Sequence, residues 1–98
     1  MTTSQERDFN FLVVLDYASS TAQLLTDICD TQFRSGDVLH PVLRCIDLDT
    51  SGHPYLRATV LRKEDGSRRV LLVPHHTVLA IFELGTLEDP QAIGFRVE

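Results

Sequence analysis

Residues 55–84 read YLRATVLRKEDGSRRVLLVPHHTVLAIFEL, and this stretch decides the fold of the chain. It contains two β-rich segments joined by Glu64-Asp65-Gly66-Ser67, a run of residues that favour turns. A third apolar segment, residues 78–84, follows directly after Pro74-His75-His76. Consecutive β-rich segments with short connections predict an antiparallel meander. The chain is therefore expected to be built around a small antiparallel sheet.

The residues before this stretch predict another strand and one helix. Residues 38–48 have a β-like composition and end at the turn sequence Asp49-Thr50-Ser51-Gly52. Ser20-Thr21-Ala22-Gln23 fits a capping box, and the apolar residues that follow it share one helical face. One helix is therefore expected before Gly36, in the N-terminal third of the chain.

Residues 9–18 fit both a strand and a helix. Apolar residues occur at every second position from Phe9 to Tyr17, which is typical of a strand, but Phe11, Val14 and Ala18 also fit a helical stripe. The paired β-branched Val13 and Val14 favour the strand locally. The pattern alone leaves both alternatives open.

Size and composition predict a single domain. The chain has 98 residues with 43% apolar content, which is enough for one core and too little for two independently folded units. Residues 1–98 are therefore expected to form one domain, with its central part at about residues 28–84 and a C-terminal extension that carries a short strand at residues 93–97. Domains of this size are stable by only about 5–15 kcal/mol, so self-association through strand edges would be a common supplement.

The charge is unevenly distributed along the chain. The net charge is −5, but residues 57–69 hold five of the nine basic residues and only two acidic ones, which leaves −8 on the rest of the chain. An acidic body disfavours general binding to polyanions, because phosphate contacts depend on a positive surface. No DNA partner is expected, and the basic segment is the one candidate footprint for a negatively charged ligand.

Neither a membrane segment nor a disulfide framework is expected. No apolar run approaches the roughly 20 residues that a membrane-spanning helix needs, and residues 1–8 lack the basic start of a secretory signal. Cys29 and Cys45 show no metal-binding or redox spacing, and free thiols are the expected state of such a pair. A cytoplasmic protein is predicted.

No catalytic, metal or cofactor signature is present. The sequence lacks a Gly-rich phosphate loop, a nucleophile elbow and a paired-carboxylate motif. Asp47-Leu48-Asp49-Thr50-Ser51-Gly52 begins like a calcium loop, but Ala58 occupies the twelfth position, where an acid is required, so an Asx-type turn is expected instead. His75 and His76 are adjacent, so on a strand their side chains would leave opposite faces and could not hold one metal ion.

Residues 36–81 resemble the Sm-like family of RNA-binding proteins. Ser35-Gly36 stands where the family has Asn-Gly, Ile46-Asp47-Leu48-Asp49 is similar to the end of its bent strand, and Val60-Leu61-Arg62 is similar to its third strand. Residues 73–81 are similar to the closing segment of the family, with His76 at its histidine. The chain departs from the family at Pro41, where a glycine is common, and in residues 50–54, which look like an insertion.

The resemblance implies a fold and a ligand. The fold would be mainly β, a small, strongly bent five-stranded antiparallel barrel of Sm-like or SH3-like type that forms rings through strand edges. The ligand would be single-stranded RNA, with His76 at the family's histidine, His75 in the place of its lysine and Tyr55 as the stacking aromatic.

A non-enzymatic binding or adaptor module that forms homo-oligomers is the predicted function, with an RNA-binding protein as the alternative. A small enzyme that uses Cys45 or a histidine is the second alternative. The candidate contact residues are Tyr55, Arg57, Arg62, Arg68, Arg69, His75 and His76. No catalytic residue, metal ligand or cofactor is predicted.

Overall fold

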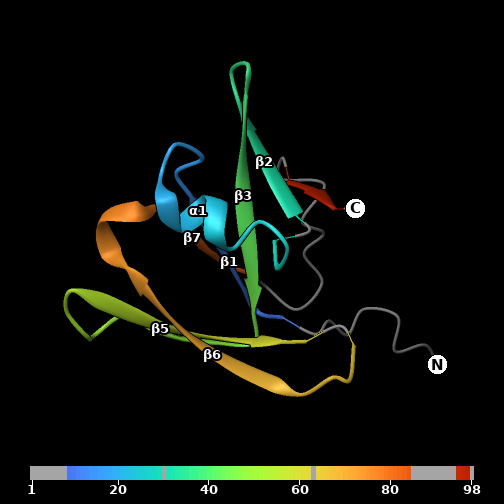
Figure 1. Cartoon of the computed structure of the whole chain (residues 1–98), viewed down its shortest axis with the longest axis vertical. Coiled ribbons are helices and arrows are strands. Elements are labelled where there is room, and N and C mark those ends of the chain that lie inside the picture. Colours follow the sequence, from blue (N-terminus) through green and yellow to red (C-terminus); the bar gives the residue numbers. More distant parts are fainter. Residues whose placement is uncertain (1–8, 30, 63, 85–94, 98) are drawn as a thin grey trace.

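The computed structural model describes residues 9–29, 31–62, 64–84 and 95–97 of the chain (Figure 1). The strands are β1 Phe11–Leu15, β2 Thr31–Ser35, β3 Val38–Cys45, β4 Asp47–Asp49, β5 Tyr55–Leu61, β6 Arg68–Pro74, β7 Val78–Glu83 and β8 Phe95–Val97. The helix α1 spans Ser20–Leu24, and a 3-10 helix, η1, spans His75–Thr77.

The described strands form two antiparallel sheets. The first has five strands in the order β7-β1-β3-β2-β8, and the second has three in the order β4-β5-β6. The chain passes from one sheet to the other at Ile46, between β3 and β4, where the N–H of Ile46 donates to the carbonyl of Thr59 at 2.8 Å. In Figure 1 the β5–β6 hairpin runs across the direction of β3, so the two sheets cross rather than align.

The predicted five-stranded barrel is wrong, although the mainly β class holds. Neither sheet closes on itself, because β6 pairs only with β5 and β7 pairs only with β1 among the described residues. The hairpin of β2 and β3, which turns at Gly36 with a φ of 63°, lengthens the first sheet beyond the second. β3 pairs along its first half with β2 and along its second half with β1, so the first sheet is open and its strands are staggered.

The predicted helix is present but short. Ser19, not Ser20, is its N-cap, and the Ser19 hydroxyl accepts a hydrogen bond from the N–H of Ala22 at 3.0 Å. After five residues the chain continues in turns, so α1 covers the core mainly with Ala22, which is 1% exposed. Among the described residues no helix approaches the length and apolarity needed to cross a membrane.

The ambiguous residues 9–18 contain β1, an interior strand of the first sheet. It lies between β7 and β3, so both of its edges are hydrogen-bonded. Val13 and Leu15 pack in the cluster between the two sheets, whereas Leu12 and Val14 pack in a second cluster on the opposite face. A strand buried on both faces is apolar at every position, which is why neither period stood out in the sequence.

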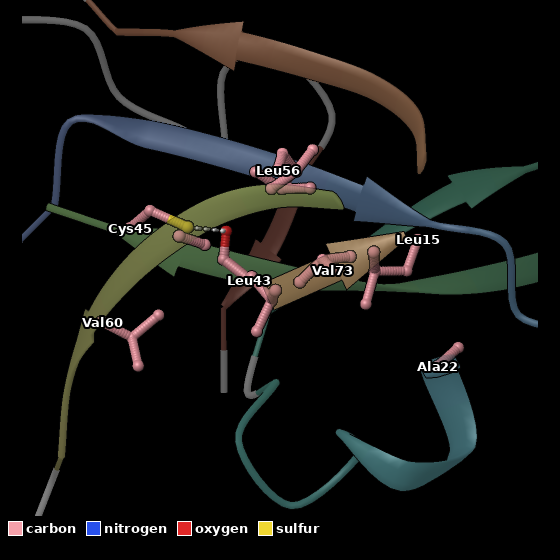
Figure 2. Packing of buried hydrophobic residues seen from close by; sticks show 9 residues of the cluster. Leu15, Ala22, Leu43, Cys45, Leu56, Val60 and Val73 are labelled. Carbon is pink, nitrogen blue, oxygen red and sulfur yellow. Dashed lines mark hydrogen bonds between the residues drawn. The ribbon is translucent and has the colours of Figure 1, made fainter. Parts of the chain in front are cut away.

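The main core lies between the sheets. The first sheet contributes Val13, Leu15, Leu43 and Cys45, the second contributes Leu56, Ala58, Val60 and Val73, and α1 adds Ala22. Figure 2 shows Leu15, Leu43 and Val73 close together, with Leu56 on one side of them and Ala22 on the other. The second, smaller cluster is formed by Phe9, Leu12, Val14, Val42 and Leu84.

The end of the chain contributes one more strand. β8 pairs antiparallel with β2, and Phe95 lies opposite Phe33. The prediction of a strand at residues 93–97 is therefore met at residues 95–97, and residues 93 and 94 lie outside the described part.

Candidate binding surface

The β5–β6 hairpin has one dry face and one wet face. Leu56, Ala58 and Val60 of β5 point into the core, so Tyr55, Arg57 and Thr59 point outward. The register sets Leu56 opposite Val73 on the inner face. The outer face is therefore formed by alternate residues of both strands.

An apolar stripe runs along this outer face. It consists of Tyr55, Val70, Leu72 and Pro74, and we call it the outer stripe. Val70, Leu72 and Pro74 occupy every second position of β6, and Tyr55 lies opposite Pro74. Tyr55 is 48% exposed, Val70 48% and Leu72 61%. Large apolar side chains that lie side by side in water mark a surface that binds another apolar surface.

The charges around the outer stripe nearly cancel. Arg57 lies between Leu72 on β6 and Asp49 on β4, and Asp47 lies opposite Thr59 in the next row. Arg68 lies opposite Leu61 at the far end of the hairpin. The two arginines and two aspartates of this face therefore give a mixed surface rather than a basic one.

A pair of histidines closes one end of the outer stripe. The rings of His53 and His75 are nearly parallel, with centroids 5.0 Å apart and an interplanar angle of 13°. The Nε2–H of His75 donates to the carbonyl of Gly52 at 2.7 Å, and its backbone N–H donates to the carbonyl of Pro54 at 2.9 Å. His75 thus fastens the loop that precedes Tyr55 to the end of β6.

The structure divides the predicted contact residues into two groups. Tyr55, Arg57 and Arg68 lie on the outer face, and His75, followed by the exposed His76, lies at its end. Arg62 and Arg69 instead line a pocket on the other side of the hairpin. Arg68 and Arg69 are neighbours on one strand, so their side chains leave opposite faces and do not form a single basic surface.

His53 was missed as a member of this group. Its imidazole reaches His75 across the sheet end, a tertiary contact between residues that are far apart in the sequence. The signal available in the sequence was the register of the hairpin, because pairing Tyr55 with Pro74 brings the residues before Tyr55 near His75.

Strands β6 and β7 are both open at one side. Each pairs with a single neighbour among the described residues, so each leaves half of its backbone N–H and carbonyl groups on a free edge. On β7, Leu79 is 53% exposed and Ile81 is 39% exposed. Two free edges that carry exposed apolar side chains thus flank the short turn η1.

The residues of the predicted Asx turn make the expected contacts. The Oδ1 of Asp49 accepts from the backbone N–H of Ser51 at 2.9 Å and from its hydroxyl at 2.6 Å. These hydrogen bonds, the hydroxyl first, hold the pKa of Asp49 below its usual range. In the described part of the chain no cluster of three or more His, Cys, Asp or Glu residues could hold a metal ion.

The thiol of Cys45 is poorly placed for nucleophilic chemistry. Cys45 and Cys29 are not joined by a disulfide, and Cys45 is fully buried in the main core (Figure 2). Burial raises the pKa of the Cys45 thiol to about 12, and the Sγ lies 3.9 Å from the carbonyl oxygen of Leu43. At neutral pH the group is a protonated, packed side chain, whereas a nucleophilic cysteine is a thiolate.

Because its thiol is buried, Cys45 should make the free energy of unfolding depend on pH in the alkaline range. Its pKa rises on folding from the ordinary 9.0 to about 12. Below pH 9 the thiol is therefore protonated in both the folded and the unfolded chain. Between these values the unfolded chain loses the proton and the folded chain keeps it, so stability falls by up to about 1.4 kcal/mol per pH unit. Urea unfolding at a series of pH values should show this loss in the native protein and a flatter profile in Cys45→Ala. Equal slopes for the two proteins would contradict it.

The chain matches no protein-family model, no curated protein and no solved structure. The candidate surface is therefore described by its own geometry: an apolar outer stripe with balanced charges, a histidine pair at its end, and two strand edges beside it that are unpaired among the described residues.

Proposed function

We propose that this protein is a non-enzymatic binding module that associates with further copies of itself through the free edges of β6 and β7. The observation that carries the proposal is the match between these edges. Exposed and less exposed residues alternate throughout β7 and from Val70 onward in β6, and both strands expose large apolar side chains next to backbone groups that are unpaired among the described residues. Open edges of this kind recruit another strand unless they are blocked.

A single register pairs the exposed apolar side chains of the two strands. If β6 of one copy pairs antiparallel with β7 of the next, placing Leu72 opposite Leu79 also places Val70 opposite Ile81. The same register sets Arg68 opposite Glu83. Two apolar pairs and one pair of opposite charges are thus formed without any other adjustment.

The same contact can repeat. Each copy offers β6 at one edge and β7 at the other, so the interface is heterologous: the second copy still has a free β6. Contacts of this type produce closed rings or open filaments, depending on the rotation between copies. Tyr55, at one end of the outer stripe, lies outside these pairs and would be displayed by every copy, as suits an adaptor.

The compartment we propose is the cytoplasm. Cys29 and Cys45 are not joined by a disulfide, and reduced thiols are the ordinary state of cysteines in a reducing compartment.

Two measurements test self-association: the mass of the native protein in solution, and the effect of reversing the charges of Arg68 and Glu83. We expect the native protein to sediment well above the 11.0 kDa of one chain. Arg68→Glu or Glu83→Arg alone places like charges opposite each other and should weaken association about tenfold, and the double variant should recover most of the loss. A native protein that stays monomeric at high concentration, or a double variant no better than the single ones, would refute the proposal.

One observation favours single-stranded RNA as a second ligand. Tyr55, His53 and His75 place three planar rings at one exposed end of the outer stripe, and bases stack on such rings. Asp47 and Asp49 on the same face oppose this ligand, which is why protein association comes first. Titration with short A-rich and U-rich RNAs at two salt concentrations tests it, because phosphate binding weakens as salt rises. A lack of binding at low salt would remove this candidate.

A further inference from the structure

A pocket of about 170 Å³ lies on the side of the hairpin opposite the outer stripe, between the turn after α1 and the tip of β5–β6. Its apolar wall is formed by Ile28, Val60 and Leu61. Its charged groups are two guanidiniums, Arg62 and Arg69, and two carboxylates, Asp27 and Glu64. The described residues that line the pocket therefore carry no net charge but include both signs.

Arg69 occupies a position where the fold would accept an apolar residue. It shares the inner face of β6 with Leu71 and Val73. In the hairpin it lies opposite Val60, which is only 4% exposed. Its own side chain is exposed and lines the pocket. A guanidinium next to the core edge is thus available to a molecule that enters the pocket.

The charged side chains of the pocket do not all pair with one another. Arg62 and Glu64 form a loose pair, with Nε and Oε1 3.9 Å apart and both side chains well exposed. Within the described residues, Arg69 and Asp27 form no ion pair. One free cation and one free anion, contributed by different elements, remain beside an apolar wall.

We infer that the pocket binds a small zwitterion, a free amino acid with a branched apolar side chain. Arg69 would take the carboxylate in its planar fork, and Asp27 would take the ammonium group. The side chain would lie on Ile28, Val60 and Leu61. A zwitterion contacts both charges, whereas a simple carboxylate would contact only Arg69.

The size of the pocket agrees with such a ligand. A cavity of about 150 Å³ holds a molecule as large as benzene. At about 170 Å³ the pocket is too small for a nucleotide and fits valine or leucine.

The ligand test compares three molecules of one shape. The isotope-labelled protein is titrated with leucine, with isocaproate, which lacks the ammonium group, and with isoamylamine, which lacks the carboxylate. Leucine should shift the amide signals of Ile28, Val60 and Leu61, and the two single-charge analogues should bind at least about tenfold more weakly. Isocaproate binding as tightly as leucine would overturn the zwitterion assignment, and a lack of shifts at these residues at high leucine would overturn the site.

The variant test assigns the two charges. Arg69→Gln and Asp27→Asn should each weaken leucine binding about tenfold, which corresponds to about 1.4 kcal/mol. Arg34→Gln and Asp37→Asn, on the exposed β2–β3 hairpin, are the matched controls and should leave it unchanged. Arg69→Gln should also leave the affinity for isoamylamine unchanged, whereas a general loss of folding would lower it. Equal affinity in Arg69→Gln and the native protein would refute the assignment.

This site is independent of self-association. The titration can be repeated with Leu72→Asp, which alters only the outer face of β6. Leucine binding should persist there, so the two proposals can fail separately.

Discussion

Replacing Leu56 by alanine should lower the free energy of unfolding by about 3–5 kcal/mol. Leu56 is fully buried in the cluster between the two sheets, where it joins β5 to side chains of β1 and β3. The substitution removes its transfer free energy and leaves a cavity that two crossed sheets cannot close by a small shift. A domain of this size is stable by only about 5–15 kcal/mol, so much of its stability would be lost.

The control is the same substitution at an exposed site. Leu24 at the end of α1 is 82% exposed, and alanine is the best helix former, so Leu24→Ala should change stability by less than about 0.5 kcal/mol. Urea unfolding followed by circular dichroism measures both variants. Similar midpoints for Leu56→Ala and Leu24→Ala would show that the sheets do not meet at Leu56.

Strands β5 and β6 of the second sheet could be predicted because their information is local, whereas residues 38–48, expected as one strand, are divided between β3 and β4. The alternation of Leu56, Ala58 and Val60 with polar residues gives a strand with one dry face, and Gly66 occupies the turn of its hairpin with a φ of 71°. The structure bears out both features. The one-sided burial of β5 follows from three residues and a period of two.

Barrel closure could not be predicted in the same way. β6 and β7 follow one another along the chain with only η1 between them, yet each pairs in a different sheet, and no residue of either strand encodes by itself whether the two strands meet. Strand β2 was not predicted either, because its sequence, Thr31–Ser35, is largely polar. It forms a strand because β3 and β8 supply its hydrogen bonds on either side, a case in which tertiary context overrides propensity.

The candidate surface could be predicted in part. The hairpin register alone would have separated Arg68 from Arg69, because adjacent strand residues leave opposite faces. The partnership of His53 with His75, and the meeting of Asp27 with Arg69 at one pocket, depend on how loops and sheets pack. Sequence periodicity contains no information on such contacts.

Two aspartate substitutions should each abolish self-association. Leu72→Asp blocks the free edge of β6, and Leu79→Asp blocks that of β7, because each sets a carboxylate where the other copy presents leucine. Losing one buried leucine contact and burying a charge together cost about 3 kcal/mol or more, a loss of at least about a hundredfold in affinity. Both leucines are more than half exposed in the single chain, at 61% and 53%, so each variant should remain folded.

Mixing the two variants distinguishes this interface from a symmetric one. Leu72→Asp retains a competent β7, and Leu79→Asp retains a competent β6, so an equimolar mixture can form one good contact per pair. Each variant alone should sediment as a monomer, and the mixture as a heterodimer that grows no further. Leu24→Asp, at an exposed site away from both edges, should assemble like the native protein. If β6 paired with β6, or β7 with β7, one variant alone would still self-associate, and that result would rule out the head-to-tail contact.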